Sequence, residues 1–118
     1  MKILVCGSRH FQDKEKLFNV LDGINSETTV TGVVEGGARG ADNLGAQWAD
    51  SRRIERTRFP ADWSRYGKSA GPIRNQQMLD EGKPDLVIAF LYPNSRGTKH
   101  MISIAEKANI KTKVIYCE

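Results

Sequence analysis

Short apolar or β-branched segments alternate along this chain with longer segments whose apolar residues recur at helical spacing. The short segments predict five strands over residues 2–6, 29–34, 54–59, 85–92 and 112–117. The longer segments predict four helices, over 13–24, from Gly40 or Ala41 to about Arg53, from Pro72 to just before Gly82, and over about 97–109. Because strands and helices alternate strictly, the sequence predicts a parallel sheet with helices on both faces.

The character of individual segments orders the strands in that sheet. The segment DLVIAFLY, 85–92, is apolar throughout its core, as expected of a strand buried on both faces. The segment IERTRF, 54–59, is half polar, as expected at an edge. Right-handed crossovers leave few topologies, and we expect an α/β, Rossmann-like three-layer sandwich with a five-stranded parallel sheet of order 3-2-1-4-5. At 118 residues, we expect residues 1–118 to form one domain.

Ligands of such sheets bind beyond the carboxyl ends of the strands, where the strand order reverses. Four segments with one arginine each meet that edge: GSR (7–9), GGARG (36–40), GPIRN (71–75) and PNSRGT (93–98). Glycines close to helix starts and arginine guanidinium groups both suit phosphate oxygens. The candidate ligand-binding residues are Gly7, Ser8, Arg9, Gly36, Gly37, Arg39, Gly40, Asp42, Arg74, Asn75, Ser95, Arg96, Gly97 and Thr98.

The segment EGGARGAD, 35–42, is interpreted as a turn that cradles phosphate through backbone N–H groups. It lacks the Gly-Lys-Ser/Thr of a P-loop, and its glycines are spaced G-G-x-x-G rather than G-x-G-x-x-G. A second interpretation is that the four arginines are simply solvated, or that Glu35 and Asp42 balance their charge within the protein.

Two aromatic residues, Trp63 and Tyr66, fall in residues 60–71, which are predicted to form a long loop. They are candidates for contact with a nucleobase. Alternatively, they cover the end of the sheet or a subunit contact, as buried aromatic side chains commonly do.

Charge and composition limit the possible partners. The net charge is +4 and the pI about 9.2, which permits an anionic partner without requiring nucleic acid. The arginines at 52, 53, 56 and 58 predict either a solvated helix end and edge strand or an added nucleic-acid patch. No apolar run is long enough for a membrane span and no signal peptide is recognised, so a cytoplasmic protein is expected.

The cysteines and histidines carry little chemistry at the level of sequence. Cys6 and Cys117 lie at the ends of apolar runs and are expected to be buried free thiols. His10 and His100 have no partner at metal-ligand spacing, so neither a metal nor a cofactor is predicted.

Several segments in order resemble the YspA-type proteins of the SLOG superfamily: MKILVCGSR, VVEGGARGADNLGAQWA, FPADW, AGPIRNQQMLDEGKPDLVIAF and SRGT. The resemblance runs from Met1 to about Tyr116. It implies a Rossmann-like fold with a site for a nucleotide or nucleotide-derived ligand, in a protein that senses or processes such molecules. A binding protein of this kind is expected to act as a sensor or to sequester its ligand. The resemblance also implies a homodimer or higher homo-oligomer, since many such proteins are dimers.

Two related groups imply different activities. GGARGAD resembles a segment of the DNA-processing protein DprA, which binds single-stranded DNA. SRGT resembles part of the PGGxGTxxE motif of the LOG phosphoribohydrolases, which cleave the N-glycosidic bond of nucleoside monophosphates. Gly97 and Thr98 match that motif, but its glutamate falls on Met101, which cannot act as a carboxylate. A nucleotide-binding protein is therefore the first expectation, a nucleotide-processing hydrolase or transferase the second, and a single-stranded DNA binder the third.

Overall fold

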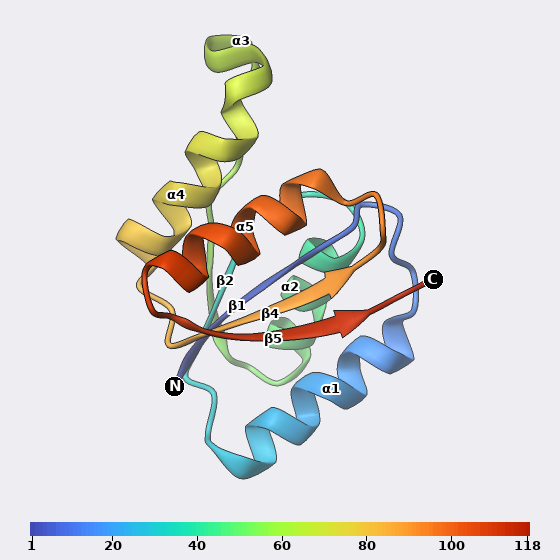
Figure 1. Ribbon diagram of the computed structural model, residues 1–118. Coiled ribbons are helices and arrows are strands. Elements are labelled where there is room, and N and C mark those ends of the chain that lie inside the picture. Colours follow the sequence, from blue (N-terminus) through green and yellow to red (C-terminus); the bar gives the residue numbers. More distant parts are fainter.

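The computed structural model describes residues 1–118 and contains one five-stranded parallel sheet with helices on both faces (Figure 1). The strand order is β3-β2-β1-β4-β5, which confirms the predicted fold class and topology. The elements are β1 (Lys2–Gly7), α1 (Lys14–Glu27), β2 (Gly32–Glu35), α2 (Ala41–Ser51), β3 (Glu55–Arg58), α3 (Trp63–Tyr66), α4 (Ala70–Gly82), β4 (Leu86–Leu91), α5 (Arg96–Lys107) and β5 (Lys111–Tyr116).

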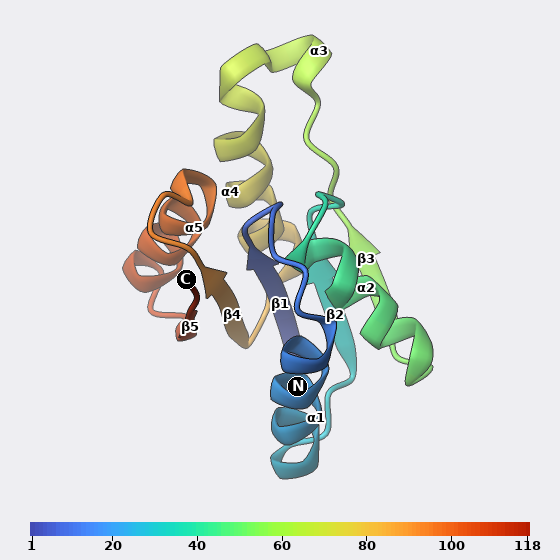
Figure 2. The same cartoon turned by 90° about the vertical axis from the view of Figure 1, so that its right-hand side faces the viewer.

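The sheet lies between two layers of helices (Figure 2), and each of its faces carries a hydrophobic core. Alternate residues of β1 point to opposite faces, so Ile3 and Val5 enter one core while Leu4 and Cys6 enter the other. The first core is covered by α1 and α2, with Trp48 fully buried. The second is covered by α4 and α5 and includes Met101.

The edge and centre of the sheet agree with the polarity of their sequences. All four residues of β3 are exposed, whereas Leu86–Phe90 of β4 are buried between the two helical layers. Because β1 and β4 pair in parallel at the centre, their carboxyl ends lie together at the point where the strand order reverses. The loops predicted to bind a ligand begin at this edge.

Most element bounds differ from prediction by a few residues, for identifiable reasons. Helix α1 continues to Glu27, three residues past the predicted end, before Thr28 adopts extended geometry. The side chain of Asn25 accepts a hydrogen bond from the Val30 N–H at 2.8 Å, which shapes the following turn and delays β2 until Gly32. Helix α5 ends at Lys107, about two residues before the predicted end.

The prediction of a loop over residues 60–71 is wrong. This region contains α3, a 3₁₀ turn over Gly67–Ser69 and the first turn of α4, which begins at Ala70 rather than Pro72. Asp62 caps α3 by accepting a hydrogen bond from the Arg65 N–H, which is typical of a helix start. These elements form an arm, residues 62–73, that projects beyond the rest of the molecule (Figures 1 and 2).

The structure also bears on the expectations for the cysteines and for membrane spans. Cys6 and Cys117 are free and buried, as predicted. None of the helices combines the length and the apolar character that crossing a bilayer requires.

Candidate functional site

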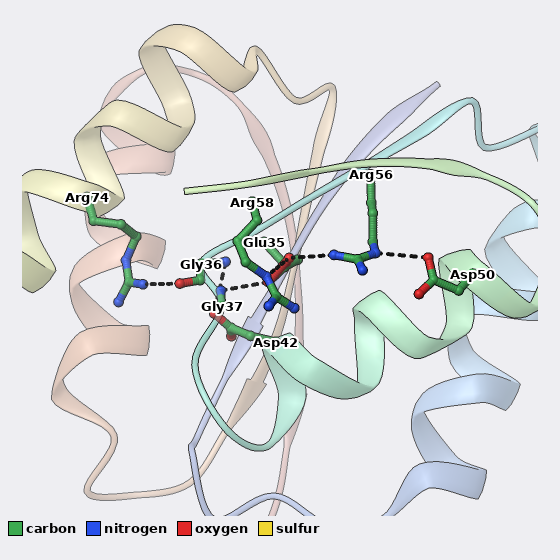
Figure 3. A network of polar contacts seen from close by, with 8 residues as sticks. All are labelled: Glu35, Gly36, Gly37, Asp42, Asp50, Arg56, Arg58 and Arg74. Carbon is green, nitrogen blue, oxygen red and sulfur yellow. Dashed lines mark hydrogen bonds and ion pairs between the residues drawn. The ribbon is translucent and has the colours of Figure 1, made fainter. Parts of the chain in front are cut away.

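A fully buried carboxylate organises the start of the glycine-rich loop. Glu35, the last residue of β2, accepts hydrogen bonds from Arg58 Nε on β3 at 2.8 and 3.1 Å and from the Gly37 N–H at 2.6 Å (Figure 3). Arg56 lies within 3.7 Å of the same carboxylate and also pairs with Asp50 at 2.9 Å. Through these contacts Glu35, at the end of β2, links that strand to β3 and to the glycine-rich loop.

Asp42, at the start of α2, is the second buried carboxylate of the loop. Its Oδ2 accepts a hydrogen bond from the Gly36 N–H at 3.0 Å. Burial raises the pKa of Asp42 to about 7, because the ionised carboxyl loses hydration that Arg74 and the Gly36 and Ala38 amides only partly replace. The acidic residues near the loop therefore have internal partners, as one of the two sequence interpretations proposed.

Arg74 and Asn75 of α4 connect the glycine-rich loop to the start of α5. Arg74 donates from Nη1 to the Gly36 carbonyl at 2.7 Å and from Nε to Asn75 Oδ1 at 3.2 Å. The Asn75 amide nitrogen donates to the Gly97 carbonyl at 3.1 Å and lies 3.1 Å from His100 Nδ1. Arg74 is consequently a bridge between loops, with only part of its donor set left for a ligand.

The loops after β1 and β2 are in direct backbone contact. The Ser8 carbonyl accepts hydrogen bonds from the Phe11 N–H at 3.1 Å and the Ala41 N–H at 3.3 Å. Gly40 has a φ of 78°, and a Cβ there would lie 2.3 Å from the Ser8 carbonyl oxygen. Glycine is required at position 40 because both the backbone conformation and the close approach exclude a side chain.

Glycines 36 and 37 also have internal reasons for lacking a side chain. A Cβ at Gly36 would lie 2.3 Å from Arg74 Nη1, and Gly37 has a φ of 74°. The Gly36 N–H donates a hydrogen bond to Asp42, and the Gly37 N–H donates one to Glu35. The backbone N–H groups of Arg39 and Gly40, and those of Asp42 and Asn43 in the first turn of α2, donate no hydrogen bond within the protein and remain free for an anion.

The start of α5 offers the clearest set of free donors. The amides of Gly97 and Thr98 make no backbone hydrogen bond. Thr98 is only 5% exposed, yet its hydroxyl has no hydrogen-bond partner within the protein. Every fully enclosed side-chain oxygen in the protein has a hydrogen-bond partner. Because the Thr98 hydroxyl has none, it reaches the surface of the site. An anion accepting from these groups would also gain from the dipole of α5.

The remaining predicted arginines keep their side chains free. Arg9, Arg39 and Arg96 are exposed and form no hydrogen bond or ion pair through their guanidinium groups. Each belongs to one of the loops at the carboxyl edge. Ser95, by contrast, closes a turn by accepting from the Tyr92 N–H at 3.3 Å, and Gly7 fits tightly against Phe90 and Ala41.

The aromatic candidates lie outside the cluster of loops. Trp63 and Tyr66 are 60% and 40% exposed on the arm, where α3 packs against α4 and the intervening turn. The arginine cluster after α2 is mostly paired: Arg52 with Asp22 at 2.7 Å, Arg56 with Asp50 and Arg58 with Glu35. These pairs reduce the free charge available to nucleic acid on that surface.

Sequence reasoning missed the roles of Arg58 and His100. Arg58 was grouped with the surface arginines, although it faces Glu35 across neighbouring strands in the register Glu35–Arg58. The sequence did contain a signal for the Glu35–Arg58 pair. Glu35 ends a buried strand, and Arg58 ends the neighbouring edge strand. His100 meets Asn75 from a different helix, and no spacing in the sequence relates the two.

The site is thus a cluster of loops at the switch point of a Rossmann-like sheet, with glycine-supported turns and free donors at two helix starts. The model of the YspA, cpYpsA-related SLOG family matches residues 1–66. The Gene 61 protein of Mycobacterium phage D29 is 36% identical over 115 residues, covering 92% of this chain and 91% of that protein. No solved structure matches. This chain belongs to the YspA, cpYpsA-related SLOG family, as the sequence resemblance predicted.

Proposed function

We propose that this protein binds a small phosphorylated nucleotide, or a molecule derived from one, at the carboxyl edge of its sheet. The observation that carries the proposal is the unpaired Thr98 hydroxyl beside the free amides of Gly97 and Thr98. A phosphate accepting these donors would give the Thr98 hydroxyl a hydrogen-bond partner and interact with the positive end of α5.

The free guanidinium groups supply the charge that such a ligand requires. Arg9 follows the turn in contact with Gly40, Arg39 precedes α2, and Arg96 begins α5. Three unpaired arginines on one group of loops make the local potential positive, which favours an anionic ligand there. In this proposal Arg74 holds the loops in register rather than serving as the main phosphate ligand, because its Nε and Nη1 already donate to Asn75 and Gly36.

Binding without turnover agrees best with the positions of the acidic residues. Glu35 is fully buried and engaged by Arg58, and Asp42 is 5% exposed and accepts from Gly36. The LOG-type glutamate position is Met101, which is also fully buried. Cleavage of a glycosidic bond would need a carboxylate or another acid–base group with access to the sugar. A sensor or a sequestering protein is the role we propose.

Isothermal titration with a panel of nucleoside mono-, di- and triphosphates tests the proposal. Arg39→Ala and Arg96→Ala should each weaken binding by about 1.5–3 kcal/mol, the usual value of a hydrogen bond to a charged group. The matched control is Arg53→Ala, which removes an exposed arginine beyond the far end of α2. Unchanged affinity in both site variants, or no binding of any nucleotide, would overturn the proposal.

The two alternative activities have separate readouts with the same protein. Release of free base from any nucleoside monophosphate, detected by chromatography, would replace the binding role with a hydrolase. A single-stranded oligonucleotide bound more tightly than mononucleotides, with affinity falling steeply between two salt concentrations, would favour the DNA-binding alternative.

A further inference from the structure

A hollow of about 340 Å³ lies at the carboxyl edge of the sheet, on the face covered by α1. Its apolar walls are Phe11, which follows β1, Tyr92, which follows β4, and Tyr116, which ends β5. Asp13 and Lys16, at the start of α1, and Glu118, after β5, add two acidic groups and one basic group to its rim. Its size is near the lower end for small-molecule sites and suits a single compact group.

The two inner walls of the hollow belong to the same turns that present the site arginines. Phe11 closes the turn that contains Arg9, through the hydrogen bond from its N–H to the Ser8 carbonyl. Tyr92 begins the turn that leads into Arg96, held by the hydrogen bond from the Ser95 N–H to the Tyr92 carbonyl at 3.1 Å. The Phe11 and Tyr92 rings lie 6.4 Å apart between centroids, so the two turns touch.

The aromatic side chains around the hollow differ in how far they are buried and packed. Phe11 is 2% exposed and packs on Phe90 with ring centroids 4.9 Å apart, so it forms a fixed floor. Tyr116 is 77% exposed, the largest exposure of any bulky apolar side chain in the protein. A planar ligand could stack on such a ring at little cost in protein rearrangement.

We propose that this hollow is the base subsite, in which Tyr116 and Tyr92 stack on the heterocycle of a nucleotide whose phosphate lies at the start of α5. The inference rests on the proposed function. It assigns base contact to Tyr92 and Tyr116 in place of Trp63 and Tyr66. The reason is that α3 packs mainly on the following turn and α4, whereas the hollow adjoins the turns that carry Arg9 and Arg96. Lys16 and Asp13 provide a donor and an acceptor for polar atoms at the edge of the base.

The experiment compares ligands that share a phosphate but differ in the base. Affinities are measured for AMP, GMP, CMP and UMP and for ribose 5-phosphate, which carries the sugar and phosphate alone. Wild-type protein should bind its preferred nucleotide more tightly than ribose 5-phosphate. Tyr116→Ala and Tyr92→Ala should each lower nucleotide affinity about 10-fold and leave ribose 5-phosphate affinity unchanged, since base–aromatic stacking contributes that much. Tyr116→Phe should retain wild-type affinity because stacking needs the ring alone.

Trp63→Ala, on the arm, is the matched aromatic control and should have no effect. If the wild type binds ribose 5-phosphate as tightly as every nucleotide, or if Trp63→Ala lowers affinity while Tyr116→Ala does not, the subsite is overturned and the phosphate site stands. If the wild type binds none of the five compounds, the proposed function itself fails for this ligand class. Tyr116 is so exposed that its alanine variant should fold normally, as circular dichroism would verify.

Discussion

At the scale of single residues, two buried carboxylates determine how the glycine-rich loop is arranged. Glu35 and Asp42 accept hydrogen bonds from the N–H groups of Gly37 and Gly36. A phosphate-cradling turn would offer these same N–H groups to its ligand. An anion-binding role therefore moves to the helix starts that follow. Nearby, burial and then the Asp42 carboxyl raise the pKa of the Cys6 thiol far above its ordinary value, so this thiol should resist alkylation in the folded protein.

The buried Asp42 should make stability depend on pH. Its pKa is about 7 when folded and 3.8 when unfolded, so the folded state binds the proton more tightly. Its contribution is therefore fully present below about pH 4 and is lost as pH rises toward 7, by up to about 4 kcal/mol. Asp42→Asn cannot ionise, and its stability relative to wild type should rise between pH 4 and 7 in urea unfolding. A pH-independent difference would contradict this prediction.

Removing the charge of Glu35 should destabilise the protein. Glu35→Gln keeps an acceptor oxygen but weakens the bonds from Arg58 and Gly37, and its amide N–H₂ is buried beside donors. We expect a loss of about 1–3 kcal/mol in the free energy of unfolding. Glu55→Gln, on the exposed strand β3, is the control and should change it by less than about 0.5 kcal/mol. Equal effects of the two substitutions would show that the Glu35 network contributes nothing.

At the scale of elements, the site depends on how closely the turns after β1 and β2 approach each other. Gly40→Ala would place a methyl group against the Ser8 and Arg9 backbone at a positive φ. We expect a loss of more than about 1 kcal/mol of stability, measured by chemical denaturation, because strain and overlap combine.

Gly23→Ala, within α1, is the opposing control for Gly40→Ala. No atom lies within 4 Å of a Cβ at position 23, and alanine is the better helix former. This variant should gain about 0.5–1 kcal/mol. Destabilisation by both substitutions, to the same extent, would mean that the approach of the two turns is not the cause.

At the scale of the whole molecule, the arm carries most of the large hydrophobic side chains that are exposed to solvent. Three of the four large hydrophobic side chains that are exposed, Trp63, Tyr66 and Ile73, lie on it. Its exposed basic residues, Arg65 and Lys68, precede α4, and exposed Asp80 and Glu81 follow near the end of that helix.

We expect two copies to associate through their arms and α4 helices in antiparallel orientation. In a twofold pair, the basic end of each copy then faces the acidic end of the other. Light scattering after size exclusion should find a dimer, and Ile73→Glu should yield a monomer. The charge reversal Lys68→Glu should weaken the dimer, and adding Glu81→Lys should restore it. A monomer at all concentrations would contradict this arrangement.

The sequence by itself determined the fold class, the strand order and the edge at which the loops collect. Those properties follow from short-range periodicity and from the limited number of right-handed parallel topologies. It also indicated that β3 lies at an edge of the sheet. It failed over residues 60–71, where a local cap at Asp62 nucleates helix in a segment that glycine and proline marked as loop.

Only the tertiary structure decided which charged residues are internal and which remain free. Arg58 and Arg74 resemble Arg39 and Arg96 in sequence, but the former engage Glu35 and the Gly36 carbonyl while the latter have no partner. The hollow at Phe11, Tyr92 and Tyr116 likewise joins segments from three parts of the chain. Pairing and shape of this kind depend on contacts between distant segments, which local patterns of residues do not encode.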